Sequence, residues 1–308
     1  MLVRDIKKVV NGRISNYDSD LEESDIRTLS QLPYPVFAMC PPIYIDAKEA
    51  IGKGSVNYEK YIGEWGNLYK ILSFEAIILL IPPKEGLSLQ TYMKTFVYLP
   101  HLDNVIILSN FGNWNKFLGE EIVAGDILIE NGYKVINAPF RFNGYNNLKH
   151  LKGNIYFGGI NQFVDNRIYD WLEKTYGLKI IRIALNAQSL SNNLFVLDIE
   201  NVMMNASLPE VKEVKKIVNV IPVQADMCSI GICNNIRVTT SMINASSLQS
   251  MEAHDAGYNA ELKKNNMLID ICKKLNYDIT FLQIGEAQKH GMFGCCDFIT
   301  PLNVGFSK

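Results

Sequence analysis

The sequence has few of the residues and patterns that mark specialised protein classes. Only four histidines occur in 308 residues, and the six cysteines include no Cys-x-x-Cys pair. Neither set has the spacing of a zinc site or the density of a disulfide framework. No glycine-rich phosphate loop stands between a strand-like and a helix-like segment. We therefore expect free thiols in a reducing compartment, with no resident metal and no cofactor.

Long apolar runs and an excess of one charge are also lacking. The longest apolar run spans residues 76–83, far short of the roughly 20 residues that a membrane helix needs. Charged residues near the start interrupt any apolar stretch typical of a secretory signal. The 30 basic and 32 acidic residues nearly balance, so nothing drives binding to phosphate backbones or anionic lipid. We expect a cytoplasmic protein that binds neither nucleic acid nor membrane.

The chain is instead rich in material for a folded core and repeats one pattern. Hydrophobic residues make up 48% of the sequence and charged residues 20%. Five short β-branched segments of a first kind lie at 74–83, 133–140, 178–185, 217–223 and 277–284. Five of a second kind lie at 104–112, 153–159, 194–202, 230–238 and 295–302. Helix-like segments occur at 57–71, 117–130, 163–176, 209–216 and 259–275.

Five similar units in one chain predict a closed ring with pseudo-fivefold symmetry. Because no unit can bury its apolar face alone, the ring forms one domain over residues 31–308. The acidic segment before it belongs to an N-terminal arm, residues 1–30. A site on the ring axis would collect residues from all five units. A doubly wound sheet with uneven crossovers is the alternative architecture.

The order of five short segments along the chain gives further information about the fold. They are MCPPIY at 39–44, VIILSNFG at 105–112, RFNGY at 141–145, FVLD at 195–198 and GEAQKHGMFGCCDFITPL at 285–302. Their order and spacing resemble the pentein superfamily, which includes amidinotransferases, arginine deiminases and dimethylarginine dimethylaminohydrolases. The resemblance covers about residues 32–302. It implies an α/β fold, a pentein-like α/β propeller of ββαβ-type units.

The resemblance also implies a chemistry, in which a cysteine thiolate attacks the carbon of a guanidinium group. A histidine then moves protons, and carboxylates hold the cationic nitrogens. Cys296 aligns with the nucleophile, with Cys295 as its rival. Asp198 matches the aspartate of the family's His-Leu-Asp motif, whereas Val196 occupies the position of the histidine. Valine cannot move a proton.

Amides stand where the family has its substrate-holding acids. Asn143 and Asn146 fall in the segment that carries Glu-Gly-Gly-Asp in relatives. Asn104, with Asp103 beside it, falls where a substrate-holding aspartate precedes a strand, and Asn110 ends that strand. These five are the candidate substrate-binding residues. An amide accepts hydrogen bonds from a cation, but it adds no charge and is no general base near neutral pH.

Each candidate also has a plainer interpretation. Cys296 suits a buried small hydrophobe in the last strand, and Asp198 suits a carboxylate satisfied by the backbone. The asparagines suit an ordinary turn. His290, six residues before Cys296, and His254 are the candidate replacement bases, and both also suit polar surface loops.

Two hypotheses for the function remain. The residue-by-residue comparison favours a catalytically degenerate member of the superfamily, acting as a binding, regulatory or structural module with a second copy or another protein as partner. The alternative is an active amidinotransferase or arginine-type hydrolase, with a covalent amidino-enzyme intermediate on cysteine. In either case the implied ligand is a small guanidino or arginine-like molecule. A pocket with a thiol, a histidine and two carboxylates would favour the enzyme; a pocket lined by amides or apolar groups would favour the module.

Overall fold

The strands form five separate sheets of three strands each. The computed structural model describes residues 28–45, 56–113, 117–186 and 188–303. Within them lie β1 (Val36–Met39), β2 (Ile77–Leu80), β3 (Phe96–Leu99), β4 (Val105–Leu108), β5 (Lys134–Asn137), β6 (Leu148–Lys152), β7 (Ile155–Ile160), β8 (Lys179–Ala184), β9 (Leu194–Val196), β10 (Asn201–Asn205), β11 (Asn219–Val223), β12 (Ile236–Val238), β13 (Ser241–Ala245), β14 (Asp278–Leu282) and β15 (Thr300–Asn303). The sheet orders are β15-β1-β2, β3-β4-β5, β6-β7-β8, β9-β10-β11 and β12-β13-β14. The five expected units are thus confirmed as a mixed α/β fold, although none of these sheets closes on itself. The predicted N-terminal arm lies outside the described residues, apart from 28–30.

Every sheet is built in the same way. An inner strand pairs antiparallel with a middle strand, a helix follows, and an outer strand pairs parallel with the middle one; β3, β4 and β5 show this order. Parallel strands need a crossover connection, which the helix supplies. The crossover helices are α2 (Tyr58–Glu75), α3 (Glu120–Glu130), α4 (Arg167–Tyr176), α6 (Val211–Val214) and α8 (Tyr258–Leu275). All five overlap the helix-like segments expected from the sequence.

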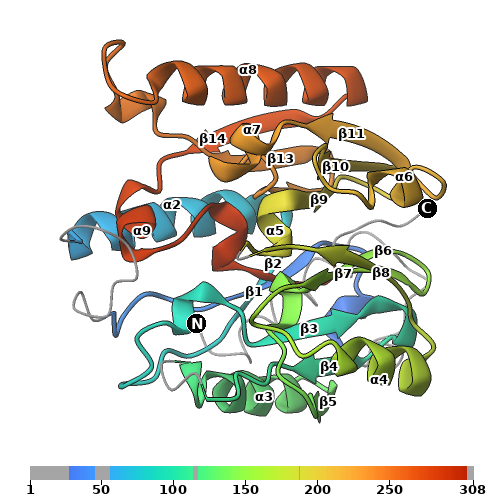
Figure 1. Ribbon diagram of the computed structural model, residues 1–308. Helices are drawn as coiled ribbons and strands as arrows, with labels where there is room; N and C mark the ends of the chain where they lie inside the picture. The colour runs from blue at the N-terminus through green and yellow to red at the C-terminus, as the bar shows by residue number, and fades with distance from the viewer. Residues whose placement is uncertain (1–27, 46–55, 114–116, 187, 304–308) are drawn as a thin grey trace.

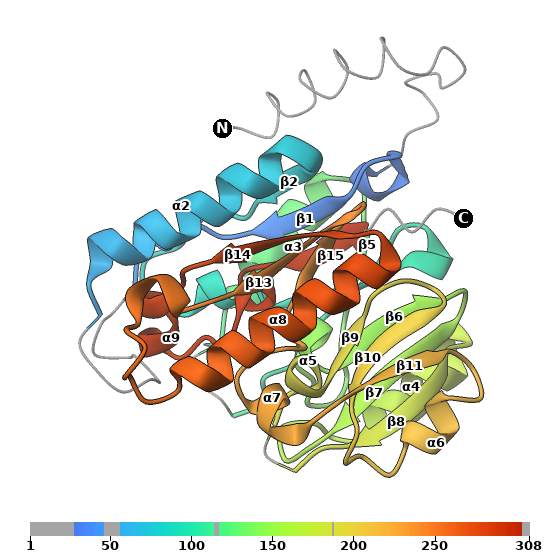
Figure 2. The ribbon, with the colours of Figure 1, turned by 90° about the horizontal axis from the view of Figure 1, so that it is seen from above.

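The first sheet joins the two ends of the described chain. β1 pairs parallel with β2 and antiparallel with β15, so that Ala38 lies opposite Thr300. The inner strand of this unit therefore comes from the C-terminal end, while its middle and outer strands come from the N-terminal end. Figure 2 shows β1 and β15 side by side.

Burial explains why these segments form strands and helices. β1 (VFAM) and β4 (VIIL) are apolar and buried at every position, which is typical of strands covered on both faces. In α2 the buried residues Tyr61, Trp65, Leu68 and Leu72 recur every three or four positions and form one face. Figure 1 shows α8, α3 and α4 on the outside of the molecule, and Figure 2 shows α2 and α8 from above.

The segment 194–202 is not the single strand that the sequence predicts. It forms the hairpin of β9 and β10, with Asp198 in the turn between them. Asp198 Oδ1 accepts hydrogen bonds from the backbone N–H of Glu200 at 2.8 Å and of Asn201 at 2.7 Å. Such side-chain bonds to the backbone two or three residues on stabilise a turn. The hydrogen bonds of Asp198 thus favour a turn here, although the apolar residues around it predict a continuous strand.

Two further predicted strands begin with a helical turn. Of the segment 230–238, only the end is strand, as β12, after helix α7 (Ala225–Ser229) and a turn. The segment 295–302 starts with the 3-10 helix η9 (Cys295–Phe298) before β15. Cys296 therefore lies in a helical turn and not in the last strand. Both Cys295 and Cys296 are buried, whereas the alternation of a strand would send them to opposite faces.

Short helical turns precede the other inner strands as well. They are η4 (Gln90–Tyr92) before β3, η7 (Gly144–Asn146) before β6 and α5 (Leu190–Asn193) before β9. Each turn brings the chain back from an outer strand to the middle of the molecule. The side chains at these turns are therefore positioned at the same end of the inner strands.

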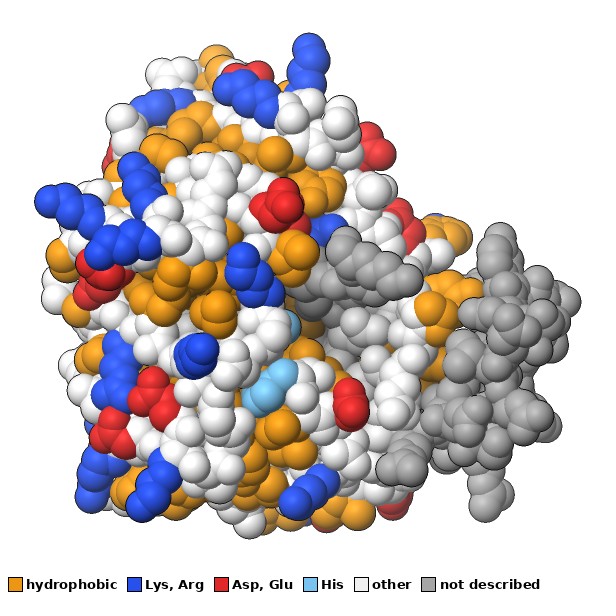
Figure 3. All heavy atoms as spheres, turned by 90° about the vertical axis from the view of Figure 1, so that its right-hand side faces the viewer, with side chains coloured by type: hydrophobic (Ala, Val, Ile, Leu, Met, Phe, Trp, Pro, Cys, Tyr) orange, Lys and Arg blue, Asp and Glu red, His pale blue; other side chains and the backbone are white. Residues whose placement is uncertain are grey.

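The surface and the polar clusters give no sign of a membrane span or a metal centre in the described part of the chain. None of its helices is both long and apolar enough to cross a membrane. No group of three or more His, Cys, Asp or Glu side chains in it is placed to hold a metal ion. The face in Figure 3 carries basic and acidic side chains interspersed, without a continuous basic patch. The six cysteines are buried free thiols.

Gly144 should be required where η7 approaches the second sheet. It has a φ of +47°, and an added Cβ would lie 2.6 Å from the carbonyl oxygen of Phe96. Gly153 has a similar φ of +51° but nothing within 4 Å. We expect Gly153→Ala to lower the free energy of unfolding by about 1 kcal/mol, and Gly144→Ala by a further ~1–3 kcal/mol from the overpacking. Urea unfolding of both variants measures the difference, and equal losses would contradict the close approach.

Candidate functional site

A cavity lies where the inner strands of all five sheets meet. The second residue of every inner strand lines it: Val97, Lys149, Phe195, Arg237 and Pro301. The cavity has a volume of about 70 Å³, which suits several water molecules or one small functional group, since about 10–15 Å³ of such volume holds one water. A site on an axis shared by five units requires that each unit contribute the residue at the equivalent position of its inner strand.

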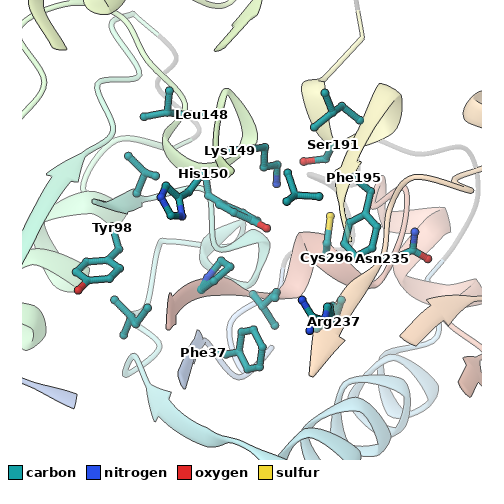
Figure 4. Close-up of a pocket in the computed structure, with 18 of the residues that line it drawn as sticks. Phe37, Tyr98, Leu148, Lys149, His150, Ser191, Phe195, Asn235, Arg237 and Cys296 are labelled. Carbon is teal, nitrogen blue, oxygen red and sulfur yellow. The ribbon is translucent and has the colours of Figure 1, made fainter. Parts of the chain in front are cut away.

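Three polar side chains from different units converge in this cavity. Figure 4 shows the amine of Lys149, from β6, directed toward the hydroxyl of Ser191, from α5, and the sulfur of Cys296, from η9. Lys149 is 5% exposed and Cys296 4% exposed. A thiol, a hydroxyl and an amine therefore share a site that is almost closed to solvent.

The thiol of Cys296 lies beside the hydroxyl of Ser191 (Figure 4). Burial raises the pKa of this thiol, and the nearby Ser191 hydroxyl acts in the opposite direction. Ser191 Oγ donates a hydrogen bond to Asn146 Oδ1 at 3.4 Å. The backbone N–H of Cys296 donates to Asn234 Oδ1 at 3.0 Å. Cys296 is thus held through its backbone, with Ser191 next to its sulfur.

Asn234 can hold Cys296 only because a glycine precedes the cysteine pair. A Cβ on Gly294 would lie 2.5 Å from Asn234 Oδ1, closer than real Cβ atoms approach. Asn234 is itself fixed, since its Nδ2 donates to Asn192 Oδ1 at 3.3 Å. Amides from neighbouring units therefore set the position of the thiol.

Lys149 is an unusual residue for so enclosed a position. Its Nζ lies 3.1 Å from the centroid of the Tyr145 ring, a cation–π contact. Among the described residues, no hydrogen-bond or salt-bridge partner of this Nζ is found. Buried charges in proteins are normally paired, so the three N–H donors of Lys149 remain available to a molecule in the cavity.

Burial and charge set the protonation states of the two reactive groups. Burial lowers the pKa of Lys149 to about 8 and raises the pKa of Cys296 to about 12, although the nearby Lys149 charge acts in the opposite direction on Cys296. Near pH 7 the cysteine is therefore a thiol, and Lys149 is an ammonium that loses its proton at slightly alkaline pH. An amine with such a pKa suits a general acid–base.

One acidic side chain lies near the cluster but does not enter the cavity. The charge of Asp297 acts on both Cys296 and Lys149. Its Oδ2, however, accepts hydrogen bonds from the backbone N–H of Phe293 at 2.8 Å and of Gly294 at 3.3 Å. No Asp or Glu is among the described residues that line the cavity. Its polar lining consists of amides, hydroxyls and basic groups.

Of the predicted catalytic residues, the structure places Cys296 in the cavity and not Cys295. Asp198 lies in the turn after β9, where its Oδ2 accepts from the Tyr277 hydroxyl at 3.0 Å, and it does not line the cavity. Val196, at the position of the family's histidine, does line it. The position that aligns with a proton shuttle thus presents an apolar side chain to the cavity.

His290 is not the surface-loop residue that the sequence suggests. It ends α9 (Gly285–His290) and is fully buried. Its Nδ1 shares a 2.8 Å hydrogen bond with the Tyr92 hydroxyl, and it is not among the residues that line the cavity. His254 is an exposed side chain near carboxylates of Glu252 and Asp255. Neither of these two histidines lines the cavity. The histidine that does line it is His150, whose Nε2 shares a 2.8 Å hydrogen bond with the carbonyl oxygen of Gly153.

The predicted substrate-binding residues lie around the cavity and not on its wall. Asn146 is linked to the cavity by one hydrogen bond, because its Oδ1 accepts from Ser191 Oγ and Ser191 lines the cavity. Asn143 precedes η7, and its Oδ1 is buried without a hydrogen-bond partner among the described residues. Asn110 stabilises a local turn, with its Oδ1 accepting from the N–H of Gly112 at 3.0 Å.

Asp103 and Asn104 belong to the turn between β3 and β4. The carbonyl oxygen of Asp103 accepts a hydrogen bond from the Tyr98 hydroxyl at 2.6 Å. The carbonyl oxygen of Asn104 accepts from the N–H of Lys134 at 2.8 Å. The structure uses their backbone groups to join strands, and it brings neither residue to the cavity wall.

Lys149 and Ser191 were not singled out from the sequence, although a repeat marks them. The tripeptide Asn-Asn-Leu or Asn-Asn-Ile occurs at 146–148, 192–194 and 234–236, at the start of β6, β9 and β12. The residues just before the asparagine pair, Tyr145, Ser191 and Cys233, all line the cavity. So do the residues just after the tripeptide, Lys149, Phe195 and Arg237. The repeat thus identifies two positions per unit that face the common axis.

The fold is similar to that of solved arginine-modifying enzymes. The N-terminal domain of ArgZ, an arginine dihydrolase from the ornithine–ammonia cycle in cyanobacteria, matches 88% of this chain and 98% of its own, with a TM-score of 0.73 and 16% identity. AgrE, solved with ornithine and NAD⁺, matches 90% of this chain and 40% of its own, with a TM-score of 0.74 and 17% identity. A dimethylarginine dimethylaminohydrolase variant, solved as an adduct with S-methyl-L-thiocitrulline, matches 87% and 99%, with a TM-score of 0.64 and 15% identity.

These similarities concern the fold, because the identities are 15–17%. They confirm the fold that the resemblance in sequence implies, because these solved structures share it. No protein-family model matches the sequence, and no curated protein matches it.

The buried amine should make the stability of the protein depend on pH. The pKa of Lys149 is about 8 in the folded protein, against an ordinary value of 10.5. Between these pH values the unfolded chain binds more protons than the folded one, so this group makes the free energy of unfolding increase with pH. We expect Lys149→Met to be more stable than the wild type at pH 7, by up to roughly 3 kcal/mol, with the gap closing between pH 8 and 10.5. Urea unfolding of both proteins across this pH range measures the difference in their free energies of unfolding. A difference that stays constant with pH would contradict the lowered pKa of Lys149.

Proposed function

We propose that the protein is a cysteine-dependent enzyme that acts on a small substrate at a carbon bonded to nitrogen, the group that guanidino and ureido compounds share. The observation that carries this proposal is the convergence of Cys296, Lys149 and Ser191 in one narrow cavity. A nucleophile, an acid–base group with a suitable pKa and an orienting hydroxyl are the parts that covalent catalysis needs. The proposal corresponds to the active alternative that the sequence leaves open.

In this reaction each side chain has a separate role. Cys296 is the nucleophile. Lys149 takes over the proton transfer of the family's histidine, whose position in the sequence Val196 occupies. In its amine form Lys149 removes the thiol proton as sulfur attacks, and in its ammonium form it returns a proton to the leaving nitrogen. Ser191, which lies beside Cys296 and donates a hydrogen bond to Asn146, orients the sulfur. The pKa of about 8 for Lys149 predicts that activity rises from pH 7 toward pH 8.

We further propose that the five sheets surround the cavity as the blades of a propeller, in a single domain over residues 31–308. The matching positions of Val97, Lys149, Phe195, Arg237 and Pro301 on the five inner strands support this arrangement. It accounts for a site built from residues far apart in the sequence. The solved structures with this fold act on or bind arginine and related molecules, which supports a small nitrogen-rich substrate here. We also propose that the protein acts in the cytoplasm.

A second candidate function is a binding module without turnover. The raised pKa of Cys296 favours it, because a thiol that stays protonated is a weak nucleophile. In that case the cavity would hold a ligand beside Cys296 without reacting with it. The two candidates differ in one observable, the release of ammonia or amine from the ligand.

Replacing the two adjacent cysteines separately tests the proposal. We expect the wild type to release ammonia or amine from at least one member of a panel of small guanidino, ureido and carboxamide compounds. Cys296→Ser should lower that rate at least ~100-fold, because the nucleophile is lost. Cys295→Ser, the matched control, changes a buried thiol outside the cavity and should keep the rate within a few-fold. Circular dichroism confirms that both variants fold.

Two outcomes would contradict the proposal. Turnover by Cys296→Ser at the wild-type rate would exclude this cysteine as the nucleophile. Binding of a panel compound, seen by calorimetry, with no release of ammonia or amine by the wild type would favour the binding module.

A further inference from the structure

The charge of the cavity is opposite to that expected of a guanidinium site. Its described lining contains the basic side chains of Lys149, Arg237 and His150 and no carboxylate. Burial lowers the pKa of His150, which favours its neutral form. A guanidinium is a permanent cation with donors only, so it needs acceptors and preferably negative charge around it. Placing it beside the Lys149 ammonium would bring two like charges together in a site of low dielectric constant, which is strongly unfavourable.

The hydrogen-bonding groups of the cavity show the same mismatch. The amide oxygen of Asn235 already accepts a hydrogen bond from Asn244 at 2.7 Å. Lys149, in contrast, presents N–H donors that no described residue accepts, next to the sulfur of Cys296 (Figure 4). Lys149 therefore offers hydrogen-bond donors beside the sulfur, where a substrate group would bind.

A carbonyl oxygen fits these donors. When a thiol sulfur attacks a carbonyl carbon, negative charge develops on the oxygen, and a preorganised ammonium stabilises that charge most effectively in a site that excludes water. The cavity of about 70 Å³ suits a planar group of a few heavy atoms. A neutral carbonyl adds no like charge to the site.

Building on the function proposed above, we infer that the substrate presents a neutral ureido or carboxamide group to Cys296 and not a guanidinium, with Lys149 holding its carbonyl oxygen. This inference names a substrate class that differs from the arginine-type ligands of the solved structures with the same fold.

The reaction balances as a hydrolysis. The Cys296 thiol gives its proton to the Lys149 amine, sulfur bonds to the carbonyl carbon, and the C=O π pair moves onto oxygen, which the new ammonium stabilises. The oxygen pair then re-forms C=O, the C–N bond breaks, and the leaving nitrogen takes a proton from Lys149. Water attacks the thioester or thiocarbamate while Lys149 accepts a proton of that water. The C–S bond then breaks, and the leaving sulfur takes this proton from Lys149, which restores both the thiol and the amine. The net change is R–CO–NHR′ plus water to R–COOH plus R′NH₂.

A matched pair of alkylating probes tests the charge preference. 2-Chloroacetamide and 2-chloroacetamidine have the same leaving group and nearly the same shape, and they differ in a neutral C=O against a cationic C=NH₂⁺. Labelling rates at Cys296 are measured on the full chain at pH 7.5 by peptide mass spectrometry. Each rate is divided by that of glutathione with the same probe, which removes the intrinsic reactivity.

We expect the normalised rate at Cys296 to be at least ~10-fold higher with chloroacetamide than with chloroacetamidine, because only the amidine brings a second cation to Lys149. Lys149→Met should lower this ratio at least ~5-fold by removing that charge. Lys94→Met is the matched control: the charge of Lys94 also acts on Cys296 and its Nζ lies 5.0 Å from the centroid of the Tyr92 ring, but it does not line the cavity. Its ratio should stay within about twofold of the wild type.

The outcomes separate this inference from the function on which it rests. A normalised ratio below one in the wild type, or an equal ratio in wild type and Lys149→Met, would overturn the inference while Cys296 remains the selectively labelled residue. If neither probe labels Cys296 in preference to the other five cysteines, the proposed function itself fails. Labelling that follows the expected order supports both.

Discussion

The candidate site depends on the pairing of the first described strand, β1, with the last, β15. This antiparallel pairing completes the first sheet and brings the C-terminal end of the chain to the middle of the molecule. The turn just before β15 carries Cys296, so the same pairing places the thiol among residues from the other units. A change that weakened β15 would therefore affect the core and the site together.

The described lining of the cavity contains a buried amine, Lys149, and no carboxylate. Lys149 enters the cavity on β6, faces the ring of Tyr145 and lies beside Ser191 and Cys296. Burial lowers its pKa to about 8, which makes it able to exchange protons and costs the fold stability at neutral pH. A protein retains such a group most readily where function requires it. The same residue that suits acid–base catalysis also disfavours a cationic substrate, so one side chain links mechanism and specificity.

Much of the fold follows from periodicity, and little of the site does. The segment 178–185 contains β8, and 259–275 coincides with α8 within one residue, because outer strands and crossover helices have continuous apolar faces. Inner strands such as β6 were not predicted, since they are short and a polar residue, Lys149, faces the cavity where alternation predicts an apolar one. Asp198 shows the opposite error: it lies among apolar residues, yet its side chain binds the backbone and forms a turn.

The sequence by itself determined that the chain has five α/β units with a pentein-like order, and that Val196 stands where a histidine is expected. These properties depend on local patterns, which neighbouring residues express without reference to the rest of the chain. Only the tertiary structure decided that Cys296 faces the cavity, that His290 and Asp198 do not, and that Lys149 and Ser191 do. A site on a shared axis is assembled from one or two residues per unit, separated by 40 or more positions in the sequence, so their meeting depends on how the units pack.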